Sequence, residues 1–173
     1  MNNSTYIHKY LKGLISDEDT VVDMTCGGGN DTFFLCERAK KVYGFDIQKE
    51  AIEETRERCK DFANLTLIND SHTNIDKYDI TEPKLFIFNL GYYPHGDHSI
   101  ISNAKDTLVA FIKAYALLKE GGYLAITFYM GHIGGKDEYY LIDKYISDNK
   151  LNILDKYRQY RSIDEPVTYI IKK

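Results

Sequence analysis

The sequence is poor in the features that mark several large classes of protein. Its 3 cysteines are odd in number and form no CxxC pair, which argues against a disulfide framework and against a zinc knuckle. It has only 3 prolines and no low-complexity tract, and hydrophobic and charged residues make up 43% and 28% of its 173 residues. That balance is typical of a folded globular chain and argues against disorder.

Long apolar runs are also missing. No stretch reaches about 18 consecutive apolar residues, the length of a membrane-spanning helix. Residues 1–20 lack the apolar core of a secretory signal, so we expect a cytoplasmic protein with no membrane partner. The net charge of −4 gives no general attraction for nucleic acid, and RNA binding would need a local basic patch. At this length we expect one domain over residues 1–173.

Apolar spacing predicts a regular alternation of strands and helices. Short β-branched or aromatic runs indicate strands, and apolar residues three or four positions apart indicate helices. Because the first five strands alternate with helices, the sheet should be parallel there and covered on both faces. The predicted strands are residues 20–24, 41–47, 65–70, 84–90 and 123–129, and the predicted helices are residues 6–14, 32–40, 49–63, 106–120 and 138–149.

The C-terminal segment predicts a different connection. Residues 151–161 and 167–173 both have strand character, and only a short turn separates them. A link of this length cannot make a parallel crossover, so these two strands should pair in an antiparallel hairpin. The expected fold class is therefore α/β, with a mostly parallel seven-stranded sheet and a C-terminal antiparallel hairpin.

A glycine cluster, MTCGGGND from Met24 to Asp31, follows the first predicted strand. A strand, a glycine loop and a helix in that order are typical of nucleotide sites, because glycines let a ligand approach the backbone and the helix N-terminus favours an anion. Asp31 is placed to cap the helix, and Asp46 ends the next strand where it can accept from ribose hydroxyls. The cluster can also be an ordinary turn, because Thr32 occupies the third glycine position of the dinucleotide pattern.

Polar residues also follow the other predicted strands, at the sheet edge where open α/β folds bind ligands. Asp23 closes the first strand and can face the ammonium of a bound amino acid. Asp70 and Ser71 close the third strand, and Asn89 opens the motif NLGYYP at the end of the fourth.

Together these motifs resemble the class I methyltransferases that use S-adenosylmethionine, over nearly the whole chain. More narrowly, DMTCGGGNDT, FDIQ, DSH, NLGYYPHGD and YMGHIGGKDE look like motifs of the small family of bacterial tRNA wobble-uridine methyltransferases, formerly labelled rRNA methylases. Those enzymes methylate the exocyclic amine of 5-aminomethyl-2-thiouridine. The chain departs from their usual pattern at Gly28, where they have Asn, and at His95 and His98, where they have Gly and Lys.

The resemblance implies a Rossmann-like class I methyltransferase fold, S-adenosylmethionine as cofactor, tRNA as partner and a homodimer. The glycine loop would approach the methionine part of the cofactor, and Asp46 would accept from both ribose hydroxyls. Gln48 can also be a solvated helix start, and His72 can also be a core histidine satisfied by the backbone. The residues expected to bind the cofactor are Asp23, Gly27, Gly28, Gly29, Asn30, Asp31, Asp46, Gln48, Ser71 and His72.

Methyl transfer to an amine requires a neutral nitrogen with its lone pair directed at the methyl group. A primary amine has a pKa of about 10, which burial beside a sulfonium lowers, so no strong base is required. The Asn89 side-chain oxygen and the Leu90 carbonyl are placed to hold the amine hydrogens, and Asp97 can receive a proton or hold the substrate. Asn89 can also be a simple strand-end cap. The residues expected to contact the substrate are Tyr92, Tyr93, His95, His132 and Arg161, with Glu138 on the same Gly-rich loop as His132.

Several alternative hypotheses about ligands and function stay open. No metal is expected, because the HGDH segment offers His95, Asp97 and His98 with no fourth ligand nearby. Other candidate functions are methylation of a small-molecule amine or of another RNA, and NAD-dependent oxidoreduction; Thr32 and the terminal hairpin disfavour the last. Candidate RNA contacts, which alternating strand faces can also produce, are Lys136, Lys156, Arg158, Arg161, Lys172 and Lys173, interleaved with Tyr157, Tyr160 and Tyr169.

Overall fold

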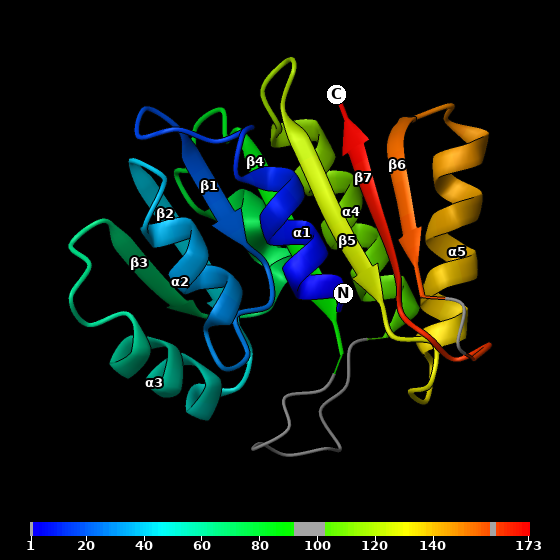
Figure 1. Cartoon of the computed structure of the whole chain (residues 1–173), viewed down its shortest axis with the longest axis horizontal. Helices are drawn as coiled ribbons and strands as arrows, with labels where there is room; N and C mark the ends of the chain where they lie inside the picture. Colours follow the sequence, from blue (N-terminus) through cyan, green and yellow to red (C-terminus); the bar gives the residue numbers. More distant parts are fainter. Residues whose placement is uncertain (1, 92–102, 160–161) are drawn as a thin grey trace.

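The computed structural model of the chain describes residues 2–91, 103–159 and 162–173, and seven strands in these ranges form one mixed sheet (Figure 1). The strand order is β3-β2-β1-β4-β5-β7-β6. Strands β1 to β5 are parallel, and β7 lies antiparallel between β5 and β6. The predicted α/β fold class with its C-terminal antiparallel hairpin is confirmed. The strands are β1 Thr20–Asp23, β2 Lys41–Asp46, β3 Leu65–Asn69, β4 Leu85–Leu90, β5 Tyr123–Phe128, β6 Asn152–Arg158 and β7 Val167–Lys172.

Helices cover both faces of this sheet. Ile7 and Leu11 of α1 and Leu35 of α2 pack on one face, and Phe111 of α4 and Ile142 of α5 pack on the other. Figure 1 shows α1 in front of the sheet and α4 behind it. None of the helices in the described part of the chain is long and apolar enough to cross a membrane. The helices are α1 Asn3–Leu11, α2 Asn30–Cys36, α3 Lys49–Arg58, η1 (3-10) His72–Lys77, α4 Ala104–Leu117 and α5 Gly135–Asp148.

Four of the five predicted helix starts lie two or three residues too late, and local capping explains the two largest differences. The first helix runs over Asn3–Leu11 and not over residues 6–14, because the Asn2 side chain accepts from the Thr5 N–H at 2.8 Å and begins the helix early. The last helix starts at Gly135, after Gly134 with φ +82°. Glu138 therefore lies inside α5 and not on the preceding loop.

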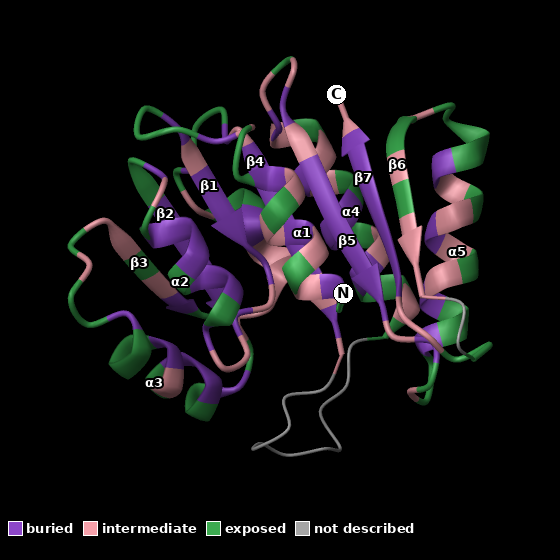
Figure 2. Ribbon diagram, in the orientation of Figure 1, coloured by how far each residue is buried: buried purple, intermediate pink, exposed green. Residues whose placement is uncertain are grey.

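The degree to which each strand is buried depends on its position in the sheet. Strands β4, β5 and β7 are buried along most of their length, because helices cover both of their faces (Figure 2). The edge strand β6 is mostly exposed or half-buried, and its Leu154 is 43% exposed. The carboxyl ends of β1, β4 and β5 lie at one end of the sheet, and Figure 1 marks the N-terminus near the arrowhead of β5. Helix α1 thus starts beside the edge where a ligand is expected.

The loop after β1 packs so closely on β2 that there is no space for a side chain at Gly44. A Cβ added at Gly44 would lie 2.6 Å from Sγ of Cys26 and 3.0 Å from Cδ2 of Leu67. We expect Gly44→Ala to lower the free energy of unfolding by about 2 kcal/mol in urea titrations, because the loop must move to make room. Gly13→Ala is the control, because an added Cβ at Gly13 meets nothing within 4 Å. It should change the free energy of unfolding by less than about 0.5 kcal/mol. Equal stability of the two variants would contradict the close approach.

Candidate active site

A cavity of about 410 Å³ lies at the carboxyl ends of the parallel strands. Ligand pockets in proteins measure about 300 to 1,000 Å³, so the cavity can hold a small molecule. Its walls come from the β1–α2 loop, the ends of β2 to β5 and the start of α1. The sequence-predicted residues that it brings together are Gly27, Gly28, Asn30, Asp31, Asp46, Gln48, Ser71, His72, Asn89, Leu90 and His132.

The glycine loop owes its shape to backbone conformations that side chains rarely adopt. Gly27 has φ +51° and Gly29 has φ +79°. Gly29 is the N-cap of α2, and a Cβ there would lie 3.0 Å from Cα of Thr55 on α3. The expectation that Asp31 caps this helix is wrong, because Asp31 lies in its first turn. Gly29 does not line the cavity either; it allows the close packing of α2 on α3.

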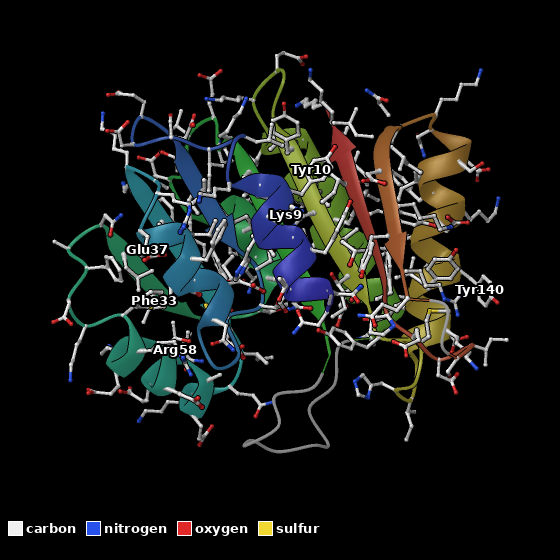
Figure 3. All side chains as sticks on the ribbon, in the orientation of Figure 1. Lys9, Tyr10, Phe33, Glu37, Arg58 and Tyr140 are labelled. Atoms are coloured by element: carbon white, nitrogen blue, oxygen red, sulfur yellow. The ribbon has the colours of Figure 1, made fainter. Side chains whose placement is uncertain are left out.

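Helix α3 closes the outer side of the same loop. Nε of Arg58, labelled in Figure 3, donates to the Gly28 carbonyl oxygen. A Cβ at Gly28 would lie 3.1 Å from Oε1 of Glu54. Residue 28 therefore has little room for a side chain on that side, although the Gly28 backbone lines the cavity.

Asp23 lies beneath the loop and does not line the cavity. Its side chain is fully buried and accepts from the Thr32 hydroxyl at 2.6 Å and from the Thr25 N–H at 3.1 Å. Burial, and then the nearby charge of Asp31, raise the pKa of Asp23. Both of its oxygens thus accept from the loop, and a contact of Asp23 with the ammonium of a ligand stays a prediction.

Asp46 ends β2 and is half-buried at the cavity wall. Its carboxylate accepts from the Gly27 N–H and from the Gln48 N–H, each at 2.9 Å. Burial raises the pKa of Asp46, and these two backbone donors oppose that rise. Each carboxylate oxygen has two acceptor sites, so Asp46 retains the capacity to bind hydroxyl groups. Ile47, which follows it and is 59% exposed, gives the cavity an apolar wall.

Ser71 and His72, at the start of η1, also line the cavity. The Ser71 hydroxyl lies 2.8 Å from the Thr73 hydroxyl and caps η1. Burial lowers the pKa of His72, and a hydrogen bond to the Met24 backbone opposes that shift. The two alternatives for His72 are thus combined: the imidazole has a backbone partner, and it also lines the cavity.

Asn89, near the end of β4, uses its backbone N–H and its Nδ2 in hydrogen bonds with described parts of the protein but not its Oδ1. Its backbone N–H donates to the Thr25 hydroxyl at 2.7 Å, and its Nδ2 donates to Oδ2 of Asp31 at 3.0 Å. Its Oδ1 is buried and has no hydrogen-bond partner among the described residues. A buried acceptor without a partner costs about 1 to 3 kcal/mol, which a protein tolerates where a ligand supplies the donor. Asn89 and Leu90 both line the cavity.

Some predicted contacts lie elsewhere. Glu138 is 3% exposed and accepts from the Thr107 hydroxyl at 2.6 Å, away from the cavity. None of the described basic candidates lines the cavity; Lys156, for example, donates to the Tyr139 and Tyr169 hydroxyls. The expected contacts Tyr92, Tyr93, His95, Asp97 and Arg161, together with His98 and Tyr160, lie outside the described residues.

Other lining residues were not predicted. Ser4 gives no sequence signal, because it is far along the chain from every motif of the site. Ile47 and Tyr129 directly follow β2 and β5, but the predicted strands 41–47 and 123–129 each ran one residue too far and included them. Burial and the charge of Asp31 raise the pKa of Tyr129, and a hydrogen bond with Asn89 lowers it. Asp70, predicted with Ser71 at the end of the third strand, also lines the cavity. The lining residues that were not predicted are Ser4, Met24, Thr25, Cys26, Ile47, Gly91, Asn103, Asp106 and Tyr129.

The charges around the cavity are of one sign. Asp31, Asp46, Asp70 and Asp106 line it, and the buried Asp23 is near enough to Asp31 and Asp46 for their charges to raise its pKa. No Lys or Arg from the described ranges lines it. Carboxylates without neighbouring cations favour a ligand that carries positive charge.

Comparison with known proteins identifies relatives over most of the chain. Residues 42–172 match the family model described as "Putative rRNA methylase". A chloroplastic tRNA (mnm(5)s(2)U34)-methyltransferase of Arabidopsis thaliana is 33% identical over 154 residues, which cover 80% of this chain and 56% of that protein. A ribosomal RNA small subunit methyltransferase A of Clostridium botulinum is 38% identical over 46% of this chain and 30% of that protein. The chain thus spans about half or less of the length of these curated relatives.

Solved structures match the chain over its whole length. A Clostridium thermocellum protein described as a "putative rRNA-methylase" superposes with a TM-score of 0.92 at 37% identity, covering 100% of this chain and 98% of that one. A Streptococcus mutans "putative methyltransferase" in complex with S-adenosylhomocysteine (SAH) superposes with a TM-score of 0.89 at 32% identity, with the same coverage.

The raised pKa of Asp23 predicts a pH-dependent stability. Between the ordinary aspartate pKa of 3.8 and the raised value, the folded chain holds a proton that the unfolded chain has lost, so stability falls as the pH rises. Asp23→Asn removes the carboxyl group that binds this proton. In urea titrations from about pH 5 to about pH 8, the free energy of unfolding should therefore fall less steeply for the variant than for the wild type. If the free energy of unfolding fell equally steeply with pH in the variant and the wild type, Asp23 would have the same pKa in the folded and unfolded chains.

Proposed function

This chain belongs to the rRNA methylase family, and we propose that it uses S-adenosylmethionine to methylate the exocyclic amine of 5-aminomethyl-(2-thio)uridine at the wobble position of tRNA. The observation that carries the proposal is the buried Oδ1 of Asn89, which has no hydrogen-bond partner in the described ranges and lies in a cavity lined by carboxylates and a glycine loop. The Arabidopsis thaliana relative named as a tRNA wobble-uridine methyltransferase supports the choice of substrate.

The residues of the cavity suit S-adenosylmethionine. Backbone N–H groups at the start of α2 suit the cofactor carboxylate, and Asp31 and its acidic neighbours suit the ammonium and the sulfonium. Asp46 would accept from the two ribose hydroxyls, with Ile47 and His72 beside the adenine. Asp31, Asp46 and Asp106 line the cavity and would repel the negative charges of a pyrophosphate, which disfavours NAD and the oxidoreductase alternative.

The end of β4 suits an amine acceptor. The Asn89 Oδ1 and the Leu90 carbonyl oxygen are uncharged acceptors that would hold the two hydrogens of a neutral amine and direct its lone pair. The amine gives one proton to solvent before it reacts. The bound cofactor supplies the methyl group, so that an N–C bond forms while the C–S bond breaks and its electron pair stays on sulfur. Tyr92, Tyr93, His95, Asp97, His132 and Arg161 are proposed as substrate contacts.

A second candidate is a methyltransferase for a small-molecule amine. It is favoured by the net charge of −4 and by the absence of Lys and Arg from the described cavity lining. Binding of tRNA requires phosphate contacts, which make activity strongly dependent on salt, whereas a small amine would show a weaker dependence.

Methyl transfer to two tRNA pools tests the proposed function. With labelled S-adenosylmethionine, a pool that carries the aminomethyl wobble uridine should be labelled, and a pool that lacks this group should not. Nucleoside mass analysis should find the methylaminomethyl product. Asn89→Ala should lower kcat about 100-fold, because the amine loses an acceptor that directs its lone pair, while cofactor affinity stays within about twofold. Labelling of neither pool by a protein that binds the cofactor would refute the tRNA substrate and leave the small amine.

Asp46 tests the cofactor assignment separately. Asp46→Ala should weaken the affinity for S-adenosylmethionine about 30-fold in calorimetry, because it removes charge-assisted hydrogen bonds worth about 2 kcal/mol. Glu50→Ala is the matched control, since Glu50 is an exposed acid in the first turn of α3 and does not line the cavity. An unchanged affinity in Asp46→Ala would remove Asp46 from the cofactor site.

A further inference from the structure

A polar chain connects helix α1 to the acceptor end of the cavity. Nε2 of His8 lies 2.7 Å from Oδ1 of Asp31, and Oδ2 of Asp31 accepts from Nδ2 of Asn89 at 3.0 Å. The side chain of Asp31 is 6% exposed and that of His8 is 27% exposed. We propose that His8 and Asp31 are positioning residues, which lock the Asn89 amide so that its Oδ1 faces the amine acceptor. This inference rests on the proposed function.

The carboxylate decides which way the amide of Asn89 points. A carboxylate is only an acceptor, so the amino group of Asn89 must face Asp31. The reversed amide would place Oδ1 against Oδ2 of Asp31, where two acceptors repel. Tyr129 is a second hydrogen-bond partner of Asn89, and Oδ1 has none among the described residues. Oδ1 is therefore the side of the amide left for a ligand.

His8 holds the other oxygen of this carboxylate. Its ring stacks on Phe34 of α2, with ring centroids 4.0 Å apart and planes 4° from parallel. Its helix is anchored on the sheet by Ile7 and Leu11, both 0% exposed. His8 and Asp31 are thus brought together by the packing of α1 on α2, and the N–H of His8 fixes how the carboxylate is rotated toward Asn89.

The position of His8 lets its effect on the orientation of the Asn89 amide be measured separately from cofactor binding. His8 does not line the cavity, although Ser4 from the same helix does. Loss of its N–H would leave a nearly buried carboxylate oxygen without that donor and free the carboxylate to rotate. The Asn89 amide would then lose its single orientation. This defect should lower the rate of transfer and change cofactor binding little, because the charge of Asp31, which is proposed to attract the cofactor, stays when the carboxylate rotates.

Three variants test the role of His8. His8→Phe keeps a ring that can stack on Phe34 and removes the donor, and His8→Gln restores a donor. Arg38→Gln is the matched control, because the Arg38 guanidinium lies 4.1 Å from the centre of the same Phe34 ring and does not line the cavity. We expect His8→Phe to lower kcat about tenfold, with the KM for tRNA and the affinity for S-adenosylmethionine within about twofold. His8→Gln should recover most of the loss, and Arg38→Gln should match the wild type.

A second readout does not depend on catalysis. The side-chain amide signals of Asn89 can be recorded by nitrogen-15 NMR and assigned by their absence in Asn89→Ala. In His8→Phe these signals should shift and exchange faster with water than in the wild type, and Arg38→Gln should leave them unchanged. Unchanged Asn89 signals in His8→Phe would overturn the inference, as would equal losses of kcat and cofactor affinity. If the wild type methylates neither tRNA pool, the proposed function fails, and the NMR comparison still decides whether His8 orients Asn89.

Discussion

The site depends on the hydrogen bonds of one buried carboxylate. Asp23, at the end of β1, accepts from the Thr25 N–H and from the Thr32 hydroxyl, and so ties both ends of the glycine loop to the strand. Thr25 in turn accepts from the backbone N–H of Asn89 on β4. The loop, the start of α2 and the acceptor end of β4 therefore form one connected network, in which the backbone of the loop stays turned toward the ligand.

This arrangement has an electrostatic cost that a suitable ligand would relieve. Asp23, Asp31 and Asp46 lie close enough that the charges of Asp31 and Asp46 both raise the pKa of Asp23. Backbone N–H groups and hydroxyls compensate only part of the burial. A ligand with a sulfonium and an ammonium would supply positive charge, so the repulsion among these carboxylates and the proposed affinity for S-adenosylmethionine have the same origin.

The topology explains why distant segments meet at this site. Parallel strands place all their carboxyl ends at one edge, which gathers Asp46, Ser71, Asn89 and Tyr129 from four separate strand ends. The antiparallel β7 fills the position beside β5 and extends the sheet, so that α1 can pack across its face with Ile170 in the same core as Ile7. Helix α1 thereby reaches the cavity, although it precedes every strand in the chain.

Local sequence patterns were enough to predict the order of the strands and helices along the chain, the antiparallel hairpin, and the candidates Asp46 and Asn89. Each of these depends on local information: a hydrophobic period, a short link, or a polar residue directly after a strand. The folded arrangement was needed to show that Asp23 holds the loop, that Glu138 pairs with Thr107, that His8 contacts Asp31 and that Tyr129 contacts Asn89. Those contacts depend on the packing of segments far apart in the chain, which no local pattern of residues encodes.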